Sequence, residues 1–172
     1  GNKLKYESET DTFLPNQSRQ QETVIGSANG SLTLKQSLAD GFSKGYQVSD
    51  EITKNGRETS VPISDEKNFG SHDKFWCMPL PNKKHYKRFV DFQNDVAVSD
   101  IQLAVREGFR SIEHVKRYTT LGMATDQGKT SNLNGLQLVS DLEKKIVPEV
   151  GHTTFRPPYT SVTIGTIIGR EV

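Results

Sequence analysis

The loop at residues 122–131, GMATDQGKTS, holds the residues of this chain that are best suited to chemistry on an anion. Gly128 allows close approach of the backbone, and Lys129 supplies a mobile positive charge. Thr130 and Ser131 offer hydroxyl groups where a helix should begin, and together these donors suit a phosphate. An ordinary helix cap formed by Thr130 or Ser131, with Lys129 in solvent, explains the same residues equally well.

The loop contains the letters GKTS but is not a Walker motif. That motif requires a glycine five residues before Gly128, where Met123 stands, and a preceding β-strand, which the sequence does not predict. We therefore do not expect a nucleoside triphosphatase.

A second candidate anion site follows the apolar residues 23–25, TVI, which predict a strand. The glycine turn at residues 26–30 comes next, and Ser31 can cap a helix whose end Gly41 and Gly45 mark. The apolar face of this helix would hold Leu34, Leu38 and Phe42. Backbone N–H groups at such a helix start favour an anion. The same order of elements occurs in many folds for steric reasons alone, and the sequence favours that structural interpretation.

Three further helices are predicted between residues 89 and 148. Ser99 would cap the first and Ser111 the second, which would stop at Gly122; the third would begin near Thr130 or Ser131 and end at Pro148. Their inward positions would be Ile101, Ala104 and Val105, then Ile112, Val115 and Tyr118, then Leu133, Leu136, Val139, Leu142 and Ile146. Such a bundle is small and needs a partner to complete its core.

The remaining elements give an α+β fold in four parts. Residues 1–47 open with a β-hairpin formed by KLKY and DTFLP and continue into the strand, turn and helix described above. Residues 48–88 are polar linker and loops, residues 89–148 form the helical bundle, and residues 149–172 form an extended strap leading toward another domain. In that strap we expect Arg156 to form an ion pair rather than to bind substrate.

Composition argues against several classes of function. The 172 residues carry a formal charge of +1, so the chain has no overall field that would attract nucleic acid or an anionic membrane. Hydrophobic residues make up 33%, which is low for a self-sufficient domain and predicts a surface that a partner buries. No apolar run is long enough to span a bilayer.

Cysteine and histidine usage gives no metal site. Cys77 is the single cysteine, which fits a reducing cytoplasm, and we interpret it as a buried, inert thiol. The four histidines have no pair at ligand spacing. The basic cluster at residues 83–88, KKHYKR, is interpreted as a solvated loop, with contacts to phosphates or an acidic partner as the alternative. Because the first residue is Gly1 rather than methionine, we expect an internal fragment of a longer chain.

Long stretches of the sequence resemble the α subunit of heterotetrameric sarcosine oxidases. The resemblance is carried by residues 90–132, VDFQNDVAVSDIQLAVREGFRSIEHVKRYTTLGMATDQGKTSN, and by residues 153–170, TTFRPPYTSVTIGTIIGR. Residues 1–16 and 24–45 resemble the penultimate hairpin and the closing turn and helix of that subunit's dinucleotide-binding domain. Residues 48–88 carry no comparable signature.

The resemblance implies a flavin-dependent amine oxidase complex with β, γ and δ subunits. Such a complex demethylates sarcosine to glycine, passes the one-carbon unit to tetrahydrofolate and produces hydrogen peroxide. NAD, FAD, FMN and tetrahydrofolate would be bound across the assembly. In this family the amine is oxidised at a flavin in the β subunit, so we place no catalytic residue in this chain and do not expect it to act alone.

The helical part also resembles the small two-iron ferredoxin module of bacterioferritin-associated ferredoxin. The positions that hold the four cluster cysteines in that module are occupied here by Asp91, Gln93, Asp126 and Ser131. These groups hold iron–sulfur clusters poorly, so the resemblance implies a module without a cluster.

The family resemblance assigns cofactor contacts to both candidate sites. The loop after the second helix would face FMN, which is linked covalently to the β subunit, and would donate to its phosphate. The proposed donors are Thr119, Thr120, Thr125, Lys129, Thr130 and Ser131. The proposed border of the NAD site is Gly26, Ser27, Gly30, Ser31, Leu32 and Thr33.

Ordinary helix capping competes with both assignments. For the whole chain, two other functions remain open. One is a noncatalytic scaffold that joins subunits, and the other is a subunit of a related dehydrogenase acting on another N-alkyl amino acid.

Overall fold

The computed structural model describes residues 3–56, 60–65, 73–80, 86–157 and 160–169. The chain divides into two compact units, Gly1–Asp73 and Lys74–Val172. The division falls inside the segment 48–88 that the sequence assigned to linker and loops. Residues 81–85, and with them half of the basic cluster at residues 83–88, lie outside the described part of the chain.

The first unit opens with the predicted β-hairpin, which the structure confirms. Strands β1 (Leu4–Glu7) and β2 (Thr12–Pro15) are antiparallel. The hydroxyl group of Tyr6 donates to the carboxylate of Asp11 in the turn, and the rings of Tyr6 and Phe13 lie 5.2 Å apart. Cross-strand aromatic pairing of this kind stabilises the register of a hairpin.

The expected strand at residues 23–25 is wrong, because these residues have no strand structure and lead directly into the 3₁₀ helix η1 (Gly26–Asn29). Helix α1 (Leu34–Thr53) follows, and its N-terminal cap is Thr33 rather than Ser31. Thr33 Oγ1 accepts from the N–H of Gln36 at 3.1 Å, while the Gln36 side chain accepts from the N–H of Thr33 at 3.3 Å. This reciprocal pair satisfies two N–H groups that Ser31 would leave open.

Helix α1 also continues well beyond its predicted end. It passes through Gly41 and Gly45 and stops only at Lys54, whose φ of 56° is left-handed. A glycine inside a helix costs about 1 kcal/mol relative to alanine, which lowers stability but does not terminate the helix. The helix therefore crosses position 47, where the sequence placed a domain boundary. None of the residues of α1 is buried.

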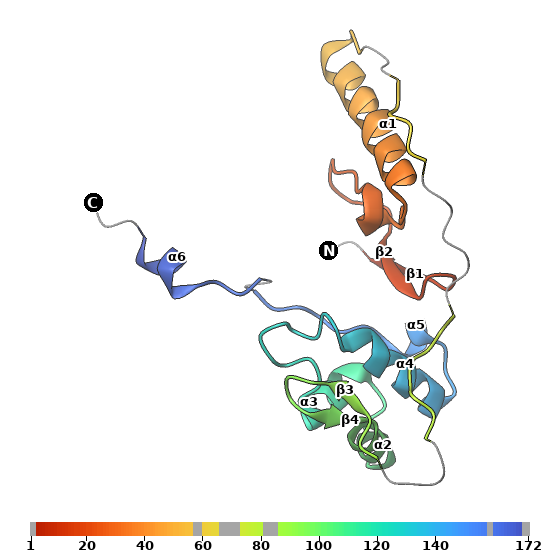
Figure 1. Ribbon diagram of the computed structural model, residues 1–172, viewed down its shortest axis with the longest axis vertical. Coiled ribbons are helices and arrows are strands. Elements are labelled where there is room, and N and C mark those ends of the chain that lie inside the picture. The colour runs from red at the N-terminus through yellow and green to blue at the C-terminus, as the bar shows by residue number, and fades with distance from the viewer. Residues whose placement is uncertain (1–2, 57–59, 66–72, 81–85, 158–159, 170–172) are drawn as a thin grey trace. The chain divides into compact units, whose positions relative to one another are not determined.

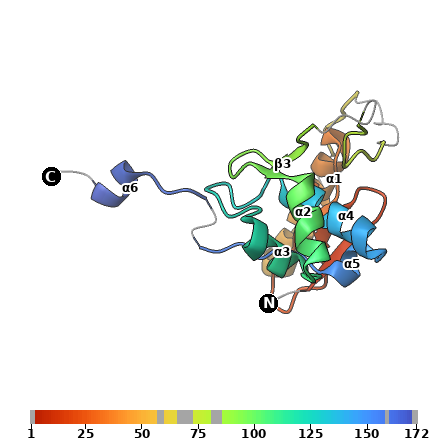
Figure 2. The same cartoon turned by 90° about the horizontal axis from the view of Figure 1, so that it is seen from below.

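The second unit combines a short hairpin with the helical bundle. Its elements are β3 (Phe89–Asp91), β4 (Val96–Ala97), α2 (Val98–Arg106), α3 (Ile112–Thr119), α4 (Asn132–Glu143), α5 (Val147–Val150) and α6 (Ile164–Ile168). Strands β3 and β4 pair antiparallel with an irregular register and were not predicted. Helix α4 packs against α2, α3 and α5, and the helices α2 to α5 lie close together in both views (Figures 1 and 2).

The core of this unit contains most of the predicted inward positions. The hydrophobic residues at 3% exposure or less are Val96, Ala97, Ile101, Ala104, Ile112, Val115, Leu121, Leu136 and Val139. Three predicted core positions are wrong, since Tyr118 is 45% exposed, Leu142 39% and Ile146 64%. Gly135 allows the Leu121 side chain to pack against α4, because a Cβ there would lie 2.5 Å from Leu121 Cδ2.

Several helix ends also differ from the prediction. Helix α2 begins at Val98 because Asp100, not Ser99, satisfies the N–H of Ala97, with Oδ2 at 2.8 Å. Ser111 does precede α3, but its side chain forms no capping bond. Pro148 does not end α4; it lies in the first turn of α5, where proline needs no N–H partner. Within the described residues, none of the helices combines the length and apolar character needed to cross a bilayer.

Candidate functional site

The buried carboxylate of Asp91 joins the β3–β4 turn to the loop between α3 and α4. Asp91 is 2% exposed, and its Oδ1 accepts from the N–H groups of Gln93 at 2.9 Å and Asn94 at 3.4 Å. Its Oδ2 accepts from the N–H of Gly122 at 2.7 Å. The side chain of Asn94 adds a bond to the carbonyl of Thr120 at 3.0 Å. Two segments distant in sequence are thus held together by one acceptor group.

The four positions that the sequence resemblance paired with the cysteines of the two-iron module lie on β3, on the turn after it and on the α3–α4 loop. Asp91 ends β3, Gln93 is on the turn, and Asp126 and Ser131 are on the α3–α4 loop. Thr125 Oγ1 lies 3.4 Å from Gln93 Oε1, a further contact between the turn and the loop. In the part of the chain that the structure describes, no group of three or more His, Cys, Asp or Glu side chains is arranged to hold a metal ion.

The side chain of Asn132 fills the interior of the α3–α4 loop. Its Nδ2 donates to the carbonyl of Gln127 at 2.9 Å. A Cβ added at Gly122 or Gly128 would lie 2.2 Å or 2.1 Å from Asn132 Oδ1, so both positions require glycine. The loop is therefore built around an amide group that the sequence analysis did not single out.

Asp126 closes the loop from its outer side. Its Oδ1 accepts from the N–H of Gly128 at 3.0 Å, and its Oδ2 accepts from Thr130 Oγ1 at 3.1 Å. The Gly128 N–H bond, followed by the Thr130 hydroxyl and N–H and by the positive charge of Lys129, lowers the pKa of Asp126 below its ordinary value, against an opposing effect of burial. A carboxylate thus already lies next to the donors that the sequence assigned to an anion.

The six predicted FMN donors differ in how the structure presents them. The exposed ones are Thr120, Thr125, Lys129 and Thr130. The hydroxyl groups of Thr119 and Thr120 donate to backbone carbonyls of Val115 and Thr119, at 2.8 Å and 2.5 Å. Ser131 is 1% exposed, and its Oγ has no hydrogen-bond partner among the described residues. The outer face of the loop is therefore formed by Thr125, Lys129 and Thr130.

The C-terminal strap is fastened to the same loop and to α3. The side-chain amide of Gln127 accepts from the N–H of Arg156 at 2.7 Å and donates to its carbonyl at 2.8 Å. The N–H of Thr154 donates to Glu113 Oε1 at 2.9 Å. Arg156 forms no ion pair with any residue that the structure describes, so the expected ion pair is not found there; the backbone of Arg156 provides the attachment.

The predicted NAD-border residues lie together at the start of the first unit's helix. Gly26 and Ser27 are in η1, and Gly30 has a φ of 89° and packs against Leu14. The N–H groups of Gly30 and Ser31 donate to the carbonyls of Ser27 and Gly26, both at 3.1 Å. Leu32 is exposed, and Thr33 caps α1. The backbone donors at residues 30 and 31 are thus bonded within the turn.

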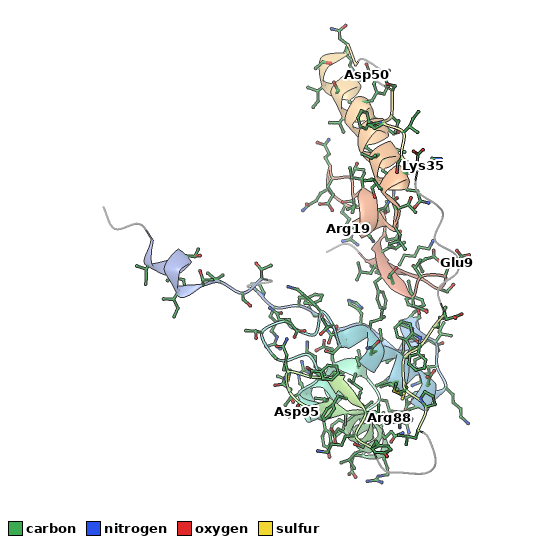
Figure 3. The ribbon with its side chains drawn as sticks, viewed as in Figure 1. Glu9, Arg19, Lys35, Asp50, Arg88 and Asp95 are labelled. Carbon is green, nitrogen blue, oxygen red and sulfur yellow. The ribbon has the colours of Figure 1, made fainter. Side chains whose placement is uncertain are left out.

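Cys77 lines an apolar hollow of about 480 Å³ in the second unit. The thiol is half-buried rather than fully buried, and its Sγ accepts from Arg88 Nη1 at 2.9 Å. Arg88, which is labelled in Figure 3, precedes β3. It also donates to the carbonyl of Met78 at 3.1 Å. Its guanidinium group therefore attaches the segment 76–80 to the beginning of the hairpin.

Comparison with known proteins identifies the family to which these elements belong. The sequence profile of the sarcosine oxidase A3 domain matches residues 85–170, half of the chain and most of the second unit. The chain belongs to the sarcosine oxidase α-subunit family. The matched region contains the Asp91 clamp, the α3–α4 loop and the strap.

Relatives match across both units. The chain is 39% identical over 170 residues to sarcosine oxidase subunit alpha of Rhizobium meliloti (strain 1021), covering 98% of this chain and 17% of that protein. It is 30% identical over 178 residues to the same subunit of Corynebacterium sp. (strain U-96), covering 98% of this chain and 18% of that protein. The chain therefore spans less than a fifth of the length of these sarcosine oxidase subunits.

A solved structure shares the fold. The crystal structure of L-proline dehydrogenase from P. horikoshii aligns with a TM-score of 0.68 and 20% identity, covering 99% of this chain and 35% of that one. At this level of identity the match establishes the architecture, a mixed arrangement of helices and short strands.

We expect Gly128→Ala to destabilise the second unit more than Gly108→Ala does. Both glycines have positive φ values, +74° and +97°, so both substitutions introduce left-handed strain. A Cβ at position 128 also overlaps Asn132, whereas one at position 108 meets nothing within 4 Å. Overpacking of this kind costs about 1–3 kcal/mol. Urea unfolding followed by the fluorescence of Trp76, the only tryptophan, measures the difference. Equal losses at the two positions would contradict the role of Asn132.

We also expect Asp126→Asn to destabilise the chain in a pH-dependent way. Because the folded state lowers the pKa of this carboxyl, its ionised form stabilises the fold. That contribution to stability is complete above the ordinary aspartate pKa of about 3.9. It is lost as the pH falls through the lower pKa that Asp126 has in the folded state. The difference between wild type and variant in urea midpoint should therefore be largest at neutral pH and shrink below about pH 4. A difference that stays constant across this range would show that Asp126 acts through packing alone.

Proposed function

We propose that this chain is a central segment of the α subunit of a flavin-dependent sarcosine oxidase that works in the cytoplasm. The complete complex would contain β, γ and δ subunits, demethylate sarcosine to glycine, pass the one-carbon unit to tetrahydrofolate and release hydrogen peroxide. The segment supplies no catalytic group and is not active alone. Its role is to support NAD and FMN and to form contacts between subunits, while FAD and tetrahydrofolate bind elsewhere.

The observation that carries this proposal is the construction of the α3–α4 loop within the family-matched region. Asp91 fixes its beginning and Asn132 fills its interior, so the loop is braced from the inside. Thr125, Lys129 and Thr130 are left exposed on its outer face. A braced loop that carries an ammonium group and hydroxyl groups suits the phosphate of a nucleotide held by a neighbouring subunit. We assign that nucleotide as FMN at the interface with the β subunit.

Within this loop Lys129 is the donor on which FMN binding would depend most. The hydroxyl of Thr130 and the N–H of Gly128 are already bonded to the Asp126 carboxylate, which also opposes a second anion. The ammonium group of Lys129 adjoins that carboxylate and can reach outward on its flexible side chain. Thr125, exposed on the same face, would add a hydroxyl group. Thr119, Thr120 and Ser131 would act by shaping the loop.

The residues bordering the first unit's turn would support NAD through their side chains. Ser27 and Leu32 are exposed, whereas the N–H groups of Gly30 and Ser31 are bonded within the turn. Among the described residues of the first unit, Asp11 is the only one that is buried. We propose that the parts of the longer subunit outside this chain cover α1 and complete the nucleotide-binding domain.

A noncatalytic scaffold is the second candidate, and the internal bonding of the loop favours it. Asp126 neutralises donors that a cofactor would otherwise use, and the strap is fastened by bonds that need no ligand. Under this alternative the second unit joins subunits or domains and touches no flavin. The two candidates differ in what Lys129 does.

In the assembled oxidase, we expect Lys129→Ala to reduce the amount of FMN bound covalently to the β subunit. Loss of a hydrogen bond to a charged group weakens binding by about 1.5–3 kcal/mol, which is roughly tenfold or more in affinity. In-gel flavin fluorescence of the denatured β subunit measures FMN incorporation, and sarcosine-dependent peroxide formation measures activity.

Arg106→Ala is the matched control, since Arg106 is exposed at the end of α2 and lies outside the loop. It should leave both measurements unchanged. If Lys129→Ala also preserves FMN content and activity while the complex still assembles, the cofactor role fails and the scaffold remains.

A further inference from the structure

A small polar pocket lies between α3, the α3–α4 loop and the strap. Its volume is about 220 Å³, and it is lined by Glu113, Lys116, Arg117, Gly122, Met123, Gln127, Thr154 and Arg156. The strap bonds of Gln127 to Arg156 and of Thr154 to Glu113 hold its walls together. Lys129 and Thr130, the outer donors of the loop, are not part of its lining.

The pocket brings three cationic side chains to one place with a single carboxylate. Oε1 of Glu113 already accepts from the N–H of Thr154 at 2.9 Å, and Oε2 lies 3.8 Å from Arg117 Nη2, a long contact. Among the residues that the structure describes, the ammonium group of Lys116 and the guanidinium group of Arg156 have no hydrogen-bond or ion-pair partner. The bonds of Arg156 to Gln127 use its backbone and leave its side chain available.

This excess of positive charge has a physical consequence. Cations gathered around one cavity repel each other, and an anion in that cavity offsets the repulsion. A phosphate monoester carries about −1.5 to −2 charges at neutral pH and three acceptor oxygens, which matches two unpaired cations better than a single carboxylate does. The volume is below the roughly 300–1,000 Å³ of whole-ligand sites, so the pocket is sized for one group of a larger molecule.

We propose that Lys116, Arg117 and Arg156 form a binding site for the phosphate group of a phosphorylated small molecule. Two sources share this chemistry, a separate phosphorylated metabolite and the phosphate of the flavin in the complex. The site is defined by its own residues, and the first source is independent of the proposed function. The second source rests on the part of the proposed function that places FMN at this segment, and it would put the flavin phosphate in this pocket instead of against Lys129. Glu113 lowers the net positive charge of the pocket, and its contact with the Arg117 guanidinium group orients that group.

The test uses the assembled oxidase and the double variant Lys116→Gln/Arg156→Gln. Its control is Arg106→Gln/Lys144→Gln, which also removes one arginine and one lysine charge, but from exposed positions outside the pocket. Inorganic phosphate is titrated calorimetrically at low ionic strength, where screening is weak. Flavin fluorescence of the denatured β subunit gives the FMN content of each protein. Subunit assembly is followed by size-exclusion chromatography.

Either of two results supports the site. Phosphate affinity that falls at least about tenfold in the test variant, with normal FMN content, indicates a separate phosphorylated ligand. FMN content that falls in the test variant and not in the control indicates the flavin phosphate. If Lys129→Ala fails to affect FMN, the proposed role of the loop is lost, but phosphate binding at this pocket should persist in that variant.

Equal phosphate affinity and equal FMN content in the test and control variants would overturn the proposal. So would a defect confined to subunit assembly, which would assign the pocket to an acidic segment of a partner protein. Should the double variant not assemble at all, Arg156→Gln alone is measured in the same way, because the backbone bonds that fasten the strap do not require its side chain.

Discussion

The buried carboxylate of Asp91 is the interaction on which the second unit depends most. It accepts hydrogen bonds from two N–H groups of the turn that follows it and from the N–H of Gly122, more than thirty positions along the chain. A buried carboxylate of this kind stabilises the fold only while its N–H donors are present. Each buried donor or acceptor left without a partner costs about 1–3 kcal/mol of folding free energy. The clamp therefore sets where the α3–α4 loop begins, and through the loop it sets the positions of Lys129 and of the pocket beneath the strap.

The loop that starts at this clamp is closed by two further side chains with different roles. Asn132 fills its interior against two glycines, and Asp126 bonds to the donors on its outer side. Together they hold the loop by hydrogen bonds of an amide and a carboxylate. The loop lies within the region that places the chain in the sarcosine oxidase α-subunit family.

Periodic patterns predicted the elements of the chain better than their ends. The segments KLKY and DTFLP predicted the first hairpin, and apolar residues spaced by three and four predicted the bundle helices with Ile101, Ile112 and Val139 inside. The ends differed because single hydrogen bonds decide them, as when Thr33 rather than Ser31 caps α1. The candidate loop lies within the family-matched region, but the sequence could not show that the Asp126 carboxylate already accepts from Gly128 and Thr130. The pocket beneath the strap was also missed, since its residues lie far apart in sequence and meet only through Gln127 and Glu113.

The central claim is that the braced face of the α3–α4 loop meets the flavin-bearing neighbour. A photoreactive benzophenone side chain placed at Thr125, which is exposed on that face, tests it directly in the assembled oxidase. The account predicts ultraviolet-dependent crosslinking to the β subunit from position 125 and little from position 106 on α2, with the crosslinked species identified by mass spectrometry. Equal labelling of the β subunit from the two positions, or no crosslink to it from position 125, would show that this face does not meet the β subunit and would contradict the account.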